Sequence, residues 1–303
     1  MISFKTFENK LYSDTKTIPI VGVPSGEFIE ISIDEYNSLI DEQLIFYNIT
    51  HKIFTFNDSS YKKIIDILKI NNDKDKFNKI ELFLQKINLK KYRIYSDETV
   101  DSFESVNIKI KMNTLPIKFE YIMGDFNISN CDLITLKNCP LTVEGNFDCS
   151  GNKLLDLVNG PWEVGKDYDA SLNELIDLSG SPIVVRGDFT VNYNSLKTLS
   201  NGPLDVMGSY YVDNCLLENL NGCPSILKNF DCSFNFLKNL LNGPKKVNKV
   251  YNCSHNELVS LKGYPEKVEE FIIHHNKLDN RDKNNIDIIN RMLSMGVIIK
   301  NKN

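Results

Sequence analysis

The stretch from Gly145 to Val164 reads GNFDCSGNKLLDLVNGPWEV, and close copies of it lie on both sides in the chain. An aromatic residue, which we call the anchor, recurs every 20 or 21 residues in these copies. Self-similarity at a fixed period of this length is typical of a stacked solenoid. We therefore predict eight solenoid repeats over residues 124–278. Their anchors are Phe126, Phe147, Tyr168, Phe189, Tyr210, Phe230, Tyr251 and Phe271.

Each position of the repeat, counted from its anchor, has a characteristic residue type. Position +2 is small or aliphatic, +7 is always Leu, and +10 is Leu and +14 is Pro in the first seven repeats. The anchor and position +2 lie on the same side of a strand, so both are expected to point into the core. Position +5 is Asn except at Cys131 and Cys215. Asn can bond backbone groups where the chain leaves the strand, which predicts a ladder of stacked Asn side chains.

The pattern resembles the leucine-rich repeat, whose core L-x-L-x-x-N-x-L is written here as Phe147-Asp-Cys149-Ser-Gly-Asn152-Lys-Leu154. The short period and the Pro-x-x-Val segment are similar to the bacterial effector subclass. The motif Phe-x-Cys-Ser-x-Asn-x-Leu is similar to that of repeat proteins of large tailed bacteriophages. The resemblance implies a horseshoe with a parallel concave sheet and a helix-poor convex side. No ubiquitin-ligase domain follows the repeats, so we do not carry over that activity of the effectors.

The chain outside the repeats is predicted to form three further parts. Residues 1–105 carry no trace of the repeat and are predicted to form an α+β module. Residues 106–123 are expected to cap the N-terminal end of the solenoid. Residues 279–303 are expected to form a C-terminal helical cap, whose helix ends near Gly296. Within the first module we expect strands over 18–23, 27–32, 44–47, 53–56 and 92–95, and helices over 34–42, 61–70 and 75–87.

Composition excludes several classes of function. The net charge of −5 disfavours a general binder of nucleic acid or of anionic membranes. No apolar run approaches the ~18 residues that span a bilayer, and the N-terminus lacks the apolar segment of a secretory signal. The seven Cys lie mostly at equivalent repeat positions, which indicates core packing rather than a disulfide framework. We expect a reducing, cytoplasmic setting, in the host cytoplasm or the virion if the protein is viral.

The concave sheet is predicted to carry an acidic surface. Eight of the twenty-four residues at positions −1, +1 and +3 are acidic and none is Lys or Arg, although the repeats hold 13 basic and 19 acidic residues. One interpretation is a solvated polar sheet whose Asp residues were copied with the repeat. The other is a non-enzymatic interaction protein that binds a basic protein partner, with Tyr211 as an aromatic contact. The predicted contacts are Asp125, Asp148, Asp167, Asp169, Asp188, Tyr211, Asp213, Asp231 and Glu270.

We predict no catalytic residue, cofactor or metal. The carboxylates lack an EF-hand loop for Ca²⁺. A Zn²⁺ site near Cys253 and His255 is disfavoured, because Cys253 should face inward and the consecutive His274 and His275 should point to opposite faces of a strand. Trp162 is expected to pack locally on the convex side. An alternative function is an enzyme or effector whose activity lies in residues 1–105, where His51 is the only histidine, with the repeats selecting its target.

Overall fold

The computed structural model describes residues 17–23, 28–32, 45–48, 53–57, 63–64 and 71–301. The chain divides into two compact units, Met1–Lys79 and Ile80–Asn303. In the first unit, one sheet has the strand order β2-β1-β4-β3, with β1 antiparallel to β2 and parallel to β4. Its strands are β1 (Thr17–Val23), β2 (Phe28–Ser32), β3 (Ile45–Asn48) and β4 (Ile53–Asn57). The helix predicted over 34–42, and all of that over 61–70 except residues 63–64, lie outside the described residues.

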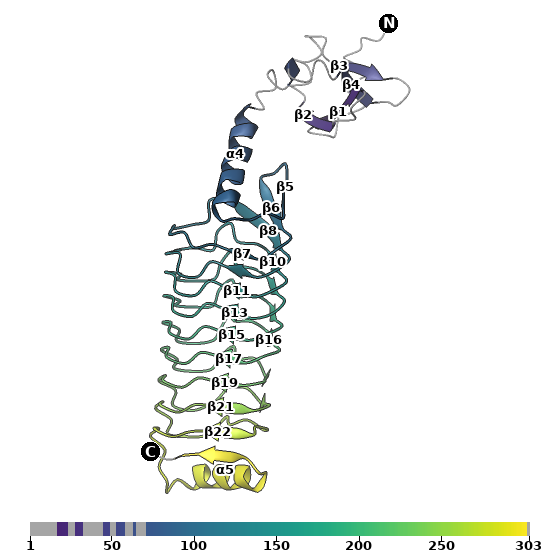
Figure 1. The fold of residues 1–303 in the computed structure, drawn as a ribbon. Coiled ribbons are helices and arrows are strands. Elements are labelled where there is room, and N and C mark those ends of the chain that lie inside the picture. Colours follow the sequence, from purple (N-terminus) through teal and green to yellow (C-terminus); the bar gives the residue numbers. More distant parts are fainter. Residues whose placement is uncertain are drawn as a thin grey trace. The chain divides into compact units, whose positions relative to one another are not determined.

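The second unit is a β-solenoid in which each turn of about 21 residues, here called a coil, stacks on the previous one (Figure 1). The anchors form a ten-stranded sheet, the anchor sheet, in which equivalent residues pair: Phe147 lies opposite Phe126 and Tyr168. The predicted solenoid with parallel sheets is confirmed. The strands of this sheet are β7 (Val106–Asn107), β9 (Phe126–Asn127), β11 (Phe147–Asp148), β13 (Tyr168–Asp169), β15 (Phe189–Thr190), β17 (Tyr210–Tyr211), β19 (Phe230–Asp231), β21 (Val250–Asn252), β22 (Glu270–Ile272) and β23 (Ile298–Lys300).

A second sheet, the back sheet, forms at positions +16 and +17 of the coils. The sequence predicted an extended, helix-poor path there, and the structure shows that this path pairs from coil to coil. Residues 124–278, all of which are described, contain no helix. The back sheet consists of β5 (Tyr92–Ile94), β6 (Thr99–Ser102), β8 (Lys118–Ile122), β10 (Thr142–Val143), β12 (Glu163–Val164), β14 (Val184–Val185) and β16 (Asp205–Val206), while β18 (Ile226–Leu227) and β20 (Lys246–Val247) pair separately.

The N-terminal end of the solenoid begins earlier than the repeats. Helix α4 (Asn71–Lys86) corresponds to the helix predicted over 75–87, and its Ile80 and Leu84 are buried in the solenoid core. Strand β6 pairs with β8, and β7 pairs with β9, so residues 106–123 supply strands to both sheets. The contacts therefore divide the chain between Lys79 and Ile80 instead of at residue 105.

A helix closes the C-terminal end, as predicted. Asp282 caps the N-terminus of helix α5 (Lys283–Ser294), because its carboxylate accepts the Asn284 N–H at 2.8 Å. Met292 is fully buried against the last coil. Asn285 is buried too; it accepts the Leu261 N–H at 3.0 Å and so satisfies a backbone group that the last coil leaves open. Strand β23 then pairs with β22 in parallel.

Hydrogen bonds from the Asn at +5 join each coil to the one before it. Asn173 is typical: its Nδ2 donates to the carbonyl oxygens of Cys149 and Ala170, each at 3.1 Å, and its Oδ1 accepts the Leu154 N–H at 3.1 Å. Cys131, one of the two exceptions, bonds the Ile108 carbonyl through its thiol at 3.2 Å. The predicted ladder thus satisfies backbone groups that the turn hides from water.

The anchor rings form a second column inside the solenoid. Their centroids lie 4.9–6.0 Å apart, with tilted, edge-on or stacked geometry. Leu at +7 and +10 fills the remaining interior and is essentially inaccessible to solvent, except Leu278 of the last repeat, which is half-buried. Aromatic pairs at such distances add about 0.5–1.5 kcal/mol beyond the area they bury.

The size of each anchor matches the residue at +13 of the preceding coil. The buried Tyr168 hydroxyl has no hydrogen-bond partner among the described residues, and a Cβ on Gly160 would lie 3.3 Å from it. The other two Tyr anchors also follow a Gly at +13. Phe anchors follow larger residues instead. The pairs are Gly160–Tyr168, Gly202–Tyr210 and Gly243–Tyr251 against Cys139–Phe147, Ser181–Phe189, Cys223–Phe230 and Tyr264–Phe271.

This match predicts a coupling between Gly160 and Tyr168. We expect Gly160→Cys to destabilise the fold by about 1–3 kcal/mol, because a Cβ there would lie 2.9 Å from Leu136 Cδ1, 3.0 Å from the Leu157 carbonyl oxygen and 3.3 Å from the Tyr168 hydroxyl. Adding Tyr168→Phe recreates the Cys139–Phe147 pair and should recover about 1 kcal/mol or more. Urea unfolding of both single variants and the double variant measures this coupling. Strictly additive effects would contradict the match.

The Asn ladder gives a second prediction. Asn173→Ala should lower the free energy of unfolding by about 1–3 kcal/mol, because the buried Leu154 N–H loses the Asn173 Oδ1 acceptor, while the Cys149 carbonyl keeps only its bond from Asn152. Asn290→Ala on the exposed surface of α5 is the matched control and should change it by less than about 0.5 kcal/mol. Equal effects of the two substitutions on urea unfolding would show that the ladder adds no stability.

Candidate functional site

The outward side of the anchor sheet, here called the anchor face, carries the predicted contact residues. Asp148 and Asp169 are register partners in neighbouring strands, and Tyr211 lies between Thr190 and Asp231. Asp167 is exposed and the other predicted contacts are half-buried. Strand alternation thus places all nine residues on one sheet face, as the sequence implied.

The acids at position +1 cap the end of their own strand. Asp148 Oδ1 accepts both the N–H and the hydroxyl of Ser150, at 3.0 and 2.6 Å. Asp231 bonds Ser233 in the same way, at 2.9 and 2.6 Å. Asp169 accepts the N–H of Ser171 at 2.8 Å. These local bonds are Asx turns, which end a strand by giving the backbone a side-chain partner.

The acids at position −1 cap the next coil instead. Asp125 Oδ1 accepts the Asn146 N–H at 2.8 Å, and Asp167 Oδ1 accepts the Asp188 N–H at 2.8 Å. Asp188 Oδ1 in turn accepts the Ser209 N–H at 2.7 Å. Six of the eight acids on the anchor face therefore satisfy backbone groups, a role that the sequence prediction did not include.

Neutral Asn performs the same capping in other coils. Asn127 and Asn252, at +1, accept the N–H of Ser129 and Ser254 at 3.0 and 3.1 Å. Asn146 and Asn229, at −1, accept the backbone N–H of the next coil at 3.1 and 3.2 Å. The fold thus needs an oxygen acceptor at these positions, and it does not need a negative charge.

The remaining two acids have different partners. Asp213 accepts hydrogen bonds from the amides of Asn192 and Asn214, at 3.3 and 2.8 Å. Glu270 forms an ion pair with Lys300 of β23 at 2.5 Å. Within the described parts of the chain it is the only one of the eight acids with a cationic partner. The negative charge of the anchor face is therefore concentrated between Asp125 and Asp231.

A row of residues at position +4 borders the anchor face. In every repeat this residue adopts the left-handed backbone conformation, with φ between 52° and 65°. The conformation is costly for side chains with a Cβ, yet the row includes Leu172, Tyr193 and Phe234, each more than half exposed. The turn after the anchor strand fixes this conformation whatever residue occupies it.

An exposed apolar row lies at position +15, at the entrance to the back sheet. Leu141, Trp162, Ile183 and Leu204 occupy four consecutive coils and are 40%, 68%, 57% and 80% exposed. Trp162 was expected to pack locally, and that expectation was wrong because its position points away from the buried Val164. The signal was available in the sequence as alternation with the Val at +17. Contiguous exposed apolar side chains of this kind are typical of contact surfaces.

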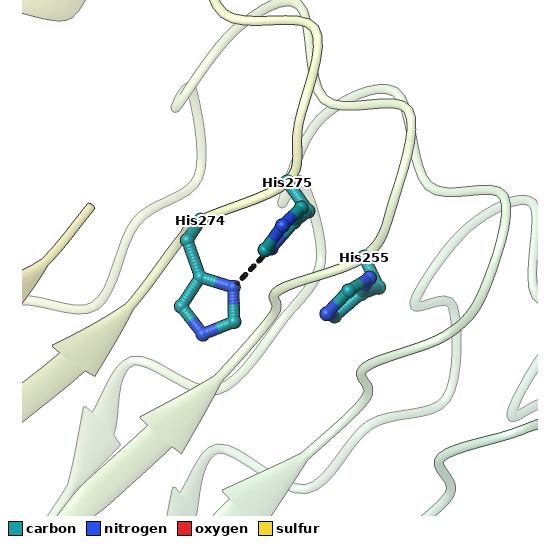
Figure 2. Close-up of side chains that lie close together, drawn as sticks. All are labelled: His255, His274 and His275. Atoms are coloured by element: carbon teal, nitrogen blue, oxygen red, sulfur yellow. Dashed lines mark hydrogen bonds between the residues drawn. The ribbon is translucent and has the colours of Figure 1, made fainter. Parts of the chain in front are cut away.

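Three histidines meet near the C-terminal end of the +4 row. His255 and His275 stack with ring centroids 4.2 Å apart and planes 9° apart (Figure 2). His274 Nδ1 lies 2.7 Å from His275 Nδ1. The expectation that His274 and His275 point to opposite faces was wrong, because the left-handed backbone at His275 (φ 54°) ends the strand alternation. Burial and the two neighbouring imidazoles lower the pKa of His255.

Cys253 takes no part in this cluster. It is fully buried, as predicted, and its thiol contacts the Ile272 carbonyl at 3.5 Å. All seven cysteines are free, and all but Cys223 are buried. Burial raises the pKa of each thiol, for Cys215 to about 12. The thiolate is the nucleophilic form, so these cysteines are poor nucleophiles in the folded protein.

Comparison with protein-family models and with curated proteins gives no match. In the described parts of the chain, no helix combines the length and the apolar character that crossing a bilayer requires. In the module predicted to hold an enzymatic activity, His51 and the segments between strands β1, β2, β3 and β4 lie outside the described residues.

Burial of the thiols predicts their reactivity. At pH 8 the native protein should react slowly with a thiol reagent such as DTNB, because a raised pKa leaves little thiolate and the core blocks access. Half-buried Cys223 should react first. All seven thiols should react quickly in denaturant, which serves as the control. Rapid reaction of two or more thiols in the native protein would contradict the buried positions.

Proposed function

We propose that this protein is a non-enzymatic binding scaffold whose anchor face takes the basic surface of a protein partner. The observation that carries the proposal is the use of Asp where Asn caps the backbone equally well. Asp148 and Asp169 are register partners in adjacent strands. Asp167 and Asp188 occupy position −1 in consecutive coils, and Asp167 Oδ1 accepts the Asp188 N–H. Like charges placed opposite one another destabilise a sheet, so the fold alone favours Asn at these positions.

The capping bonds also prepare the carboxylates for binding. Asp125, Asp167, Asp169 and Asp188 each use Oδ1 for the backbone, and within the described residues no hydrogen bond engages their Oδ2. A side chain already fixed by the fold loses less conformational entropy when a partner binds. An Oδ2 atom on each of these coils is therefore held in place for an incoming Lys or Arg.

The spacing of the coils suggests the form of the partner surface. Neighbouring strands lie about 4.8 Å apart, so the carboxylates from Asp125 to Asp231 extend over about 24 Å. Tyr211 lies within this stretch, and Tyr is enriched at binding hot spots. A basic segment or helix of that length, with Lys or Arg repeated along one side, complements this surface.

We also propose kinship with the short leucine-rich repeats of bacterial effectors and of large tailed phages, on the Asn152 and Leu154 positions of the motif. A phage host-directed factor or virion component is the setting that this resemblance favours. Free, buried thiols support a reducing compartment such as the cytoplasm.

Neutralising the anchor face tests the binding proposal. The triple variant Asp169→Asn, Asp188→Asn, Asp231→Asn keeps an acceptor oxygen at every capped N–H and removes three charges. Partners are first captured from native lysate on the wild-type protein. We expect the triple variant to fail to capture them, or to bind the purified partner at least about tenfold more weakly. Binding by the wild type should weaken in the same way as the salt concentration rises. Thermal unfolding should be unchanged or shifted upward, because like-charge repulsion falls.

The matched control is Asp156→Asn, Asp177→Asn, Asp205→Asn, which removes the same charge away from the anchor face. This variant should bind as the wild type does. Binding that survives the anchor-face variant and high salt, or that falls equally in the control, would show that the anchor face is not the binding surface.

A further inference from the structure

We propose that His255, His274 and His275 form a binding site for a divalent transition-metal ion of the Zn²⁺ type. One ligand atom from each ring lies within 4.8 Å of the other two (Figure 2). The rings are half-buried or exposed, which leaves the cluster open to an ion from solvent. This proposal is independent of the charge on the anchor face.

The backbone brings the three rings together. His255 and His275 occupy the same +4 position in consecutive coils, both left-handed, so their rings stack at 4.2 Å. Phe234, at +4 in the coil before, stacks beneath His255 at 4.1 Å and supports it from the other side. His274 at +3 adds the third ring from the anchor face. The cluster therefore joins the coil of Tyr251 to the last repeat.

The distances suit an ion after a small movement of the rings. Zn²⁺ binds imidazole nitrogen at about 2.0–2.1 Å, so two nitrogens of a tetrahedral site lie about 3.3 Å apart. The Nδ1 atoms of His274 and His275 are 2.7 Å apart, a separation at which one ring must donate a proton to the other. An ion between them would replace that proton. One ligand atom of the half-buried His255 ring already lies within 4.8 Å of those of His274 and His275, so a small rotation within its stack would bring it to the same point.

The ligand set also indicates which ions bind. Neutral imidazole suits Zn²⁺, Ni²⁺ and Cu²⁺, whereas Ca²⁺ and Mg²⁺ need oxygen ligands. Three protein ligands leave one position of a tetrahedral site for water or an external group. The site thus has the composition of an open three-histidine centre.

Residues already present in the repeats provide conservative test variants. Asn occupies the left-handed +4 position at Asn130 and Asn214, so His255→Asn and His275→Asn should keep the backbone. Ser occupies +3 in five other coils, including Ser254, so His274→Ser should do the same. His51→Asn removes the fourth histidine of the chain and serves as the matched control.

The experiment is calorimetric titration of the tag-free, full-length native protein with Zn²⁺ alone and with Ni²⁺ alone. We expect one ion per chain, an affinity at least about tenfold weaker in each cluster variant, and no change in His51→Asn. Ring ¹⁵N NMR of the wild type should show shifts of three histidines on addition of Zn²⁺, which identifies the ligands without any substitution.

Three results would overturn the site. The wild type could show no binding up to about 1 mM metal, binding could persist unchanged in the variant that combines His255→Asn, His274→Ser and His275→Asn, or His51→Asn could lose binding equally. If a cluster variant unfolds, the NMR shifts decide. Shifts confined to other residues reject the proposal, and shifts of these three rings support it.

Discussion

The structure depends on finding a hydrogen-bond partner for every backbone group at the turn that follows each anchor strand. The chain turns there toward the core, where water does not reach the peptide groups. The Asn at +5 meets this requirement with one amide, which donates within its own coil and to the previous coil and accepts an N–H in return. A buried group without a partner costs about 1–3 kcal/mol. Each Asn at +5 therefore stabilises the turn of its own coil and the contact of that coil with the previous one.

Much of this fold could be predicted because inward and outward positions alternate along each strand. The anchors, the Leu positions, the Asn ladder and the C-terminal helix follow from that pattern and its period. The back sheet could not be predicted, because strands of two residues such as β10 and β12 are too short to show alternating inward and outward positions. The extent of the solenoid was also missed. Strand β6 pairs with β8 through its backbone, and its side chains do not repeat the motif.

Alternation along the strands also decided which features of the site could be predicted from the sequence. Alternation placed Asp148 and its neighbours on one face, but it could not show that one oxygen of each carboxylate already caps the backbone. It failed at His275, because a single left-handed residue ends the alternation and turns the side chain back toward its neighbour. Position +4 is left-handed in every repeat, so this failure is systematic and recurs wherever two chemically active residues stand at +3 and +4.

The match between the anchor and the +13 residue has a consequence for how such a chain can grow or shrink. Gly and larger residues alternate at +13, and Tyr and Phe alternate with them at the anchors. Deleting residues 189–209 would place Tyr210 after Ser181 in place of Gly202, and no Tyr anchor of this chain follows a +13 residue larger than Gly. Deleting residues 168–209 would place Tyr210 after Gly160, an acceptable neighbour. A change of length by two coils therefore keeps each anchor behind a residue of the size that it now follows. From Phe147 onward, the structural unit of this solenoid is a pair of coils.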